Sequence, residues 1–73
     1  MRYMLIDVLD GTIIDKGLNM TELKGRAKDW HYETDGECML SYIPAKNGKY
    51  NLDDRKPVYT SWDDNKVVVT VVK

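Results

Sequence analysis

Leu18-Asn19-Met20-Thr21-Glu22-Leu23, the start of a segment that runs on to Trp30, decides how this chain folds. Asn19 is a favourable N-cap residue, and Glu22 stands three positions later, where its side chain can complete a capping box. Leu18 and Leu23 have the spacing of a hydrophobic staple across the same boundary. Because these signals agree on one starting point, we expect a single well-defined helix here.

The helix is expected to pack on a sheet through one apolar face. That face consists of residues at helical spacing: Met20, Leu23, Ala27 and Trp30, with His31 at its end. Gly25 lies inside the helix, where glycine costs about 1 kcal/mol relative to alanine. It either permits a close approach of another backbone or is simply tolerated.

Strand patterns lie on both sides of the helix. Tyr3–Val8 alternates, with Met4, Ile6 and Val8 on one face, and Asp10-Gly11 predicts a hairpin turn into a second strand, Thr12–Asp15. Lys16-Gly17 is expected to break this pattern and to redirect the chain towards the helix.

Three further strands are expected after the helix. The first is residues 37–43, in which Cys38, Leu40 and Tyr42 share a face, and the other two, Val58–Trp62 and Val67–Val72, form a second hairpin. Asn47-Gly48 predicts a turn. Tyr50 and Leu52 are expected to form a short edge strand after it. Val67–Val72 is apolar on both faces except at Thr70, which favours a central position in the sheet. The prediction is one α+β domain over residues 1–73, in ββαβββ order, with the helix on a mostly antiparallel sheet.

Composition narrows the classes of function. The chain has 73 residues, 11 basic and 12 acidic, and a pI of about 5.7, which disfavours non-specific binding to nucleic acid. Its only cysteine, Cys38, cannot form an internal disulfide, and no apolar run approaches the roughly 20 residues of a membrane span. We therefore expect a cytoplasmic protein outside the membrane, without cofactor.

Catalytic and metal chemistry would have to use the single histidine and the single cysteine. A nucleophilic Cys38 would need His31 within hydrogen-bond reach, and we interpret Cys38 instead as a core residue. A closed zinc site needs three or four ligands, chiefly cysteine and histidine, which this chain does not supply. No catalytic residue and no metal ligand is assigned, and an enzyme is not expected.

Aromatic residues offer a binding surface. The chain has five tyrosines, two tryptophans and no phenylalanine, and a sheet face made of Tyr42, Tyr59 and Trp62 is expected to recognise a protein, with His31 and Tyr32 as a second candidate at the helix exit. In the alternative, these residues cover the open side of a monomer. The leading hypothesis is a small regulatory module that binds another protein or associates with itself as a dimer.

A basic cluster on the helix gives a second hypothesis. Lys24, Arg26 and Lys28 precede Trp30, His31 and Tyr32, a composition that single-stranded nucleic acid can use. Glu22 is placed to pair with Arg26, and Trp30 belongs to the buried face, so an ordinary solvated helix face is favoured.

The first half of the chain also resembles a class of small proteins. Tyr3–Asp7, Asp10–Ile14 and the capped helix ending in Trp30 are similar to small uncharacterised proteins encoded by bacteriophages and prophages. The resemblance implies a short accessory protein, often a regulatory binder directed at the host, and it supplies no catalytic residues.

Overall fold

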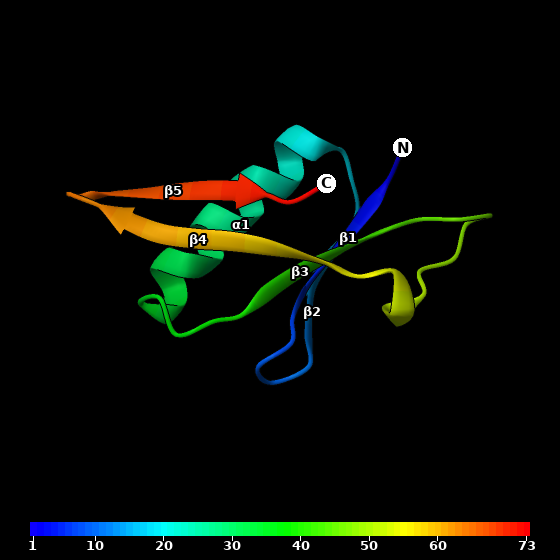
Figure 1. Cartoon of the computed structure of the whole chain (residues 1–73), viewed down its shortest axis with the longest axis horizontal. Helices are drawn as coiled ribbons and strands as arrows, with labels where there is room; N and C mark the ends of the chain where they lie inside the picture. The colour runs from blue at the N-terminus through cyan, green and yellow to red at the C-terminus, as the bar shows by residue number, and fades with distance from the viewer.

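The computed structural model describes all residues, 1–73, as one helix packed on a five-stranded sheet (Figure 1). The elements are β1 (Tyr3–Asp7), β2 (Thr12–Leu18), α1 (Met20–Thr34), β3 (Leu40–Pro44), the 3₁₀ turn η1 (Leu52–Asp54), β4 (Lys56–Asp63) and β5 (Lys66–Val71). All four strand pairings are antiparallel, and the sheet order is β2-β1-β3-β4-β5. The predicted α+β class and the ββαβββ order are confirmed.

The helix begins where the sequence predicts. The Asn19 side chain accepts a hydrogen bond of 2.8 Å from the Glu22 backbone N–H, and the Glu22 carboxylate accepts one of 2.9 Å from the Asn19 N–H. The helix ends one turn beyond Trp30, at Thr34, and Asp35 closes it with a left-handed φ of 53°. A Cβ at Gly25 would meet no atom within 4 Å, so this glycine is tolerated and does not serve a close backbone approach.

The main core lies between α1 and one face of the sheet. Its buried members come from α1 and from four of the strands: Leu5, Leu18, Leu23, Ala27, Leu40, Tyr42 and Val58. Met20 and Trp30 of the predicted apolar stripe pack against this cluster, and His31 is buried at its end. The helix therefore covers one side of the sheet and leaves the other side to solvent and to η1.

Three local predictions are wrong. The Val67–Val72 segment is not central, because β5 pairs only with β4 and forms an edge of the sheet. Tyr50 and Leu52 form no strand, since the chain turns there into η1. Lys16-Gly17 does not end the second strand, because β2 continues to Leu18 past shifts in its register with β1.

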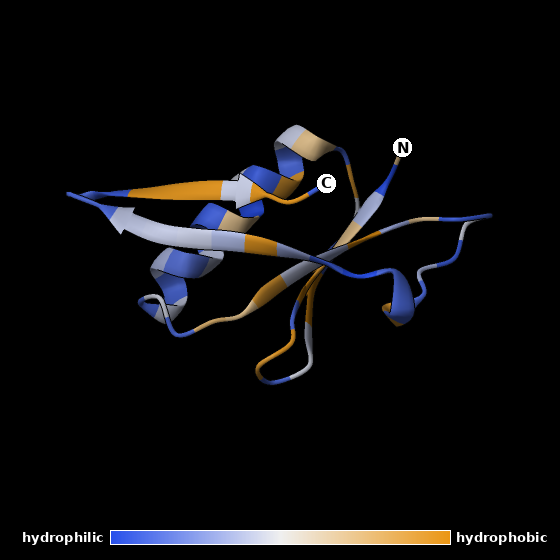
Figure 2. Ribbon diagram, in the orientation of Figure 1, coloured by the Kyte–Doolittle hydropathy of each residue, from blue (hydrophilic) through white to orange (hydrophobic).

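The prediction of a central β5 failed because it assumed that both faces of the strand are buried. Only alternate side chains of β5 face α1, although the segment Val67–Val72 consists of six β-branched residues. Val68, on the other face, is 43% exposed. Figure 2 shows β5 at the border of the sheet as a mostly hydrophobic strand that is interrupted near its end.

Candidate binding surface

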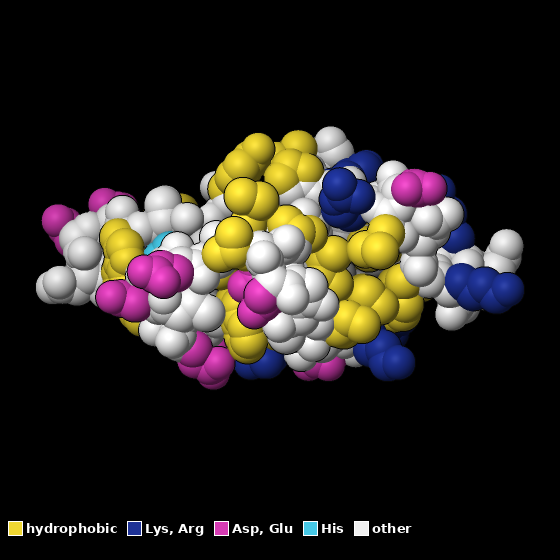
Figure 3. Space-filling view, turned by 90° about the horizontal axis from the view of Figure 1, so that it is seen from below, with side chains coloured by type: hydrophobic (Ala, Val, Ile, Leu, Met, Phe, Trp, Pro, Cys, Tyr) yellow, Lys and Arg dark blue, Asp and Glu magenta, His cyan; other side chains and the backbone are white.

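The side of the sheet that α1 leaves uncovered, which we call the open face, is rich in exposed apolar side chains. Ile13, Met39, Leu52 and Tyr59 are each more than half exposed. Figure 3, viewed from the side of the β1–β2 turn, shows hydrophobic side chains gathered across the middle of the molecule. Exposed apolar side chains that adjoin one another mark binding surfaces more often than isolated ones do.

Two hollows follow each other along the open face. The first has a volume of about 480 Å³ and lies between the β1–β2 hairpin and the η1 segment, with Ile6, Ile13 and Leu52 in its wall. The second, of about 540 Å³, lies over β3 and β4, between Met39 and Tyr59. Val8 and Arg55 line both hollows, so the two are neighbours on one surface.

Arg55 supplies the positive charge of this surface. Its guanidinium donates a hydrogen bond of 3.2 Å to the carbonyl of Leu52, and it forms no ion pair with a carboxylate of the chain. A guanidinium can hold a carboxylate through two parallel hydrogen bonds. The open face therefore combines apolar hollows with a cation that is free to bind an acidic group.

The structure does not bring the three predicted aromatic residues onto one face. Tyr42 is buried against α1, and its hydroxyl donates a hydrogen bond of 2.8 Å to the Val72 carbonyl. Tyr59 points to the open face, whereas Trp62 lies on the helix side. The prediction of a common Tyr42, Tyr59 and Trp62 face is wrong, because residues three apart on a strand point to opposite sides.

Trp62 joins the second predicted group, at the helix exit. Its ring meets those of His31 and Tyr32 edge to face, with centroids 5.0 and 5.2 Å apart. Tyr32 and Trp62 are each nearly half exposed, but His31 is buried. This cluster therefore has two partly exposed aromatic side chains, both packed against or beside a buried histidine.

His31 and Cys38 both approach the hydroxyl of Thr60. The Nδ1 atom of His31 lies 2.7 Å from this oxygen, and the Sγ atom of Cys38 lies 4.0 Å from it. The Nε2 atom of His31 has no hydrogen-bond partner and lies beside Gly36, where a Cβ would come within 3.2 Å. The histidine is thus enclosed by protein on its second nitrogen.

The basic residues of the helix are divided between its two sides. Arg26 forms an ion pair of 3.7 Å with Asp15 of β2, not with Glu22, which pairs with Arg2 at 3.8 Å. Lys24 and Lys28 are exposed and one turn apart on the other side. Trp30 is not free to stack on a base, because its indole packs against the core and bonds to Asp7.

The alternation of apolar residues in β1 could have predicted the open face, but the binding surface was predicted from aromatic residues alone. Alternation alone places Met4, Ile6 and Val8 on one side of β1, opposite Leu5. A single helix can cover only one side of a five-stranded sheet, so these residues had to face outward or find a second cover. The contributions of Leu52 and Arg55 depend on η1, which no local pattern predicted.

Comparison with known proteins yields no relative: no protein-family model, curated protein or solved structure matches this chain. No group of three or more His, Cys, Asp or Glu side chains is placed to hold a metal ion. Neither α1 nor η1 has the length and the apolar composition of a membrane-crossing helix.

Proposed function

We propose that this protein is a binding module that holds a segment of another protein on its open face. The observation that carries the proposal is the run of exposed apolar side chains opposite α1, in which Val8 and Arg55 connect two hollows. Burying these side chains against a partner would remove apolar area from water, which is the main favourable term in most protein association.

Charge defines the partner further. Arg55 stands where the two hollows meet and has no carboxylate partner in the chain. A bound segment that places apolar side chains in both hollows and an Asp or Glu between them would satisfy the guanidinium. The proposed ligand is therefore an apolar segment with one acidic residue near its middle.

Tyr59 is the expected anchor of the interface. Its ring is 61% exposed beside the second hollow, and tyrosine is enriched among the residues that dominate binding energy. Because its side chain contributes little to the core, its removal should change binding without unfolding the protein.

The test is a selection from a displayed peptide library, followed by titration of the selected peptides against labelled protein. Selected peptides should carry apolar residues around an Asp or Glu and shift the NMR signals of Val8, Ile13 and Tyr59. Tyr59→Ser should weaken binding by more than about 1 kcal/mol, roughly fivefold. Tyr32→Ser makes the same change at a tyrosine on the helix side that is 44% exposed, and it should leave binding unchanged.

Selected peptides that shift signals only around Trp62 and Tyr32 would contradict the proposal, and so would an equal effect of the two variants. Binding of the same strength by peptides in which the acidic residue is replaced by Lys would remove Arg55 from the interface.

A further inference from the structure

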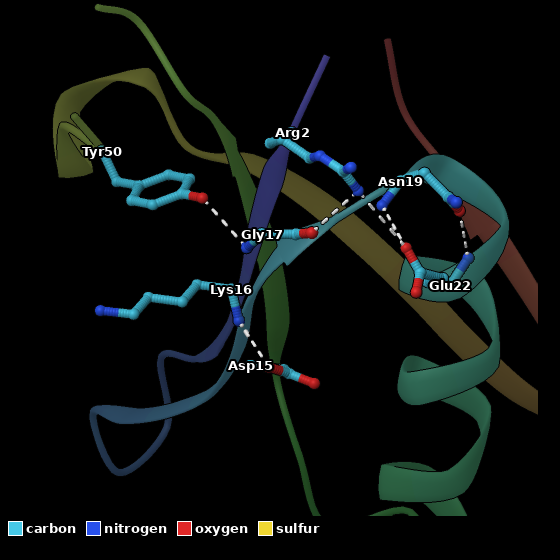
Figure 4. A network of polar contacts seen from close by, with 7 residues as sticks. All are labelled: Arg2, Asp15, Lys16, Gly17, Asn19, Glu22 and Tyr50. Carbon is cyan, nitrogen blue, oxygen red and sulfur yellow. Dashed lines mark hydrogen bonds and ion pairs between the residues drawn. The ribbon is translucent and has the colours of Figure 1, made fainter. Parts of the chain in front are cut away.

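The two edges of the sheet differ in how their free backbone groups are used. At β2, free backbone groups form hydrogen bonds with side chains of the same protein. The Gly17 N–H donates to the Tyr50 hydroxyl at 3.0 Å, and the Gly17 carbonyl accepts from Arg2 at 3.2 Å (Figure 4). The Asp15 carboxylate accepts from the Lys16 N–H at 2.8 Å. With its shifts in register and the left-handed Gly17, β2 is closed to a further strand.

The β5 edge has no such protection. Its ladder with β4 is regular over six residue pairs, from Asp63↔Lys66 to Val58↔Val71. The Val72 N–H donates to the carbonyl of Pro57 in β4, so by alternation the N–H and C=O groups of Val67, Val69 and Val71 point away from the sheet. No side chain bonds to them, and the strand contains no proline, glycine or bulge that would repel a partner.

The helix packs against β5. Met20, at the start of α1, lines a hollow with Lys73, and Tyr32, near its end, donates a long hydrogen bond of 3.5 Å to the Asn65 carbonyl. The two ends of α1 therefore lie near the two ends of β5 in the opposite order, and Figure 1 shows the helix crossing obliquely behind the β4–β5 hairpin.

Four lysines lie on the elements next to the open backbone groups: two on α1 and two at the ends of β5. Arg26 faces β2 on one flank of α1, whereas His31 bonds to Thr60 of β4 on the other. Lys24 and Lys28 precede His31 by two turns and by one turn, so they lie on the flank that faces β5. Lys66 is the first residue of β5 and Lys73 follows its end, and none of these four lysines forms an ion pair.

We propose that β5 is a second binding site, which takes an extended acidic segment of a partner protein as a sixth strand of the sheet. Backbone hydrogen bonds to Val67, Val69 and Val71 would give the pairing its affinity, and Lys24, Lys28, Lys66 and Lys73 would select carboxylates. A second copy of this chain fits less well, because it would bring its own Lys24 and Lys28 against the same edge. This site is separate from the open face and does not rest on its function.

The test uses a short synthetic peptide in which Glu alternates with Val. At a peptide concentration about ten times Kd, it should slow hydrogen exchange of the Val67, Val69 and Val71 amides roughly tenfold and leave the Gly17 amide unchanged. A peptide with Lys in place of Glu should give no protection. The acidic peptide N-methylated on its β5-facing residues should also fail, although the protein is unaltered.

Variants of surface lysines measure how much charge contributes to binding of the acidic peptide. The double change Lys24→Glu and Lys28→Glu should weaken the acidic peptide roughly tenfold at low salt, and less at high salt. The matched double change Lys16→Glu and Lys49→Glu gives the same net charge away from β5 and should bind like the original protein.

Absence of protection at β5, or equal protection by the acidic and the basic peptide, would overturn the proposal. Protection that grows with protein concentration and without peptide would overturn it in favour of a second copy. All these readouts concern β5 amides, so they can fail while peptides still bind the open face, and the reverse holds as well.

Discussion

Trp30 donates its indole N–H to the carboxylate of Asp7 across a distance of 2.9 Å, and this contact ties the last turns of α1 to the end of β1. Asp7 is 2% exposed, and its other oxygen accepts the backbone N–H groups of Leu9 and Met39 at 3.0 and 3.1 Å. One carboxylate thus joins the helix, the first hairpin turn and the approach to β3.

Replacing this carboxylate should strongly destabilise the protein. Asp7→Ala leaves three donors without an acceptor, and a buried donor without a partner costs about 1 to 3 kcal/mol. We expect the free energy of unfolding in urea to fall by at least about 3 kcal/mol. Asp10→Ala, in the same turn, removes an exposed acceptor of the Thr12 N–H and should have a much smaller effect. Equal losses for the two variants would contradict the role assigned to Asp7.

Gly25 and Gly17 allow a comparison of how backbone conformation decides the effect of replacing glycine by alanine. A Cβ meets nothing within 4 Å at either site, but Gly17 has a φ of +72° and Gly25 lies within the helix. Gly25→Ala should raise the free energy of unfolding by about 0.5 to 1 kcal/mol, because alanine is the better helix former. Gly17→Ala should lower it, because the left-handed conformation is strained for alanine. Thermal and urea unfolding of both variants would check the two signs.

The helix and the hairpins could be predicted from the sequence because their signals are local. Asn19 and Glu22 lie within one turn of each other, and Asp10-Gly11 lies between the strands that it connects. The sheet order could not be predicted in this way, because the pairing of β1 with β3 joins residues on either side of the helix. Val67–Val72 therefore looked like a central strand, although it forms an edge.

The candidate surfaces, too, could be predicted only where local patterns determine them. Alternation correctly separated Met4 and Ile6 from Leu5, but the prediction of an aromatic face ignored alternation between Tyr59 and Trp62. Asp7 gave no signal at all, because its three donors come from segments that meet only in the folded chain.

The contact of Thr60 with His31 should be important for stability. Thr60→Val keeps the β-branched shape but leaves the Nδ1 atom of His31 without its partner at 2.7 Å, while its Nε2 atom already has none. We expect a loss of about 1 to 3 kcal/mol in the free energy of unfolding, and a smaller loss for Thr60→Ser, which keeps the hydroxyl. Thr70→Val makes the same change at an exposed neighbour on β5 and should be nearly neutral. A neutral Thr60→Val would show that this hydrogen bond does not stabilise the fold.

Tyr42 should make the fold sensitive to alkaline pH. Burial, with a smaller contribution from Tyr3, raises the pKa of the Tyr42 phenol above its ordinary value of 10.0. In the unfolded chain the proton leaves near pH 10, whereas the folded chain holds it to higher pH. The folded state therefore binds more protons above this pH, and the free energy of unfolding falls as the pH rises from there towards the pKa of the folded protein.

Urea unfolding at a series of pH values from neutral to about pH 11 would measure this slope. Tyr42→Phe should lower stability at neutral pH, because the hydrogen bond to the Val72 carbonyl is lost, but it should flatten the decline above pH 10. Tyr59→Phe changes an exposed tyrosine and should keep the original slope. If Tyr42→Phe declined as steeply as the unaltered protein, the alkaline loss would have to come from another group. In that case, a pH titration of the folded protein followed by phenolate absorbance should show no tyrosine with a pKa above the ordinary value of 10.0.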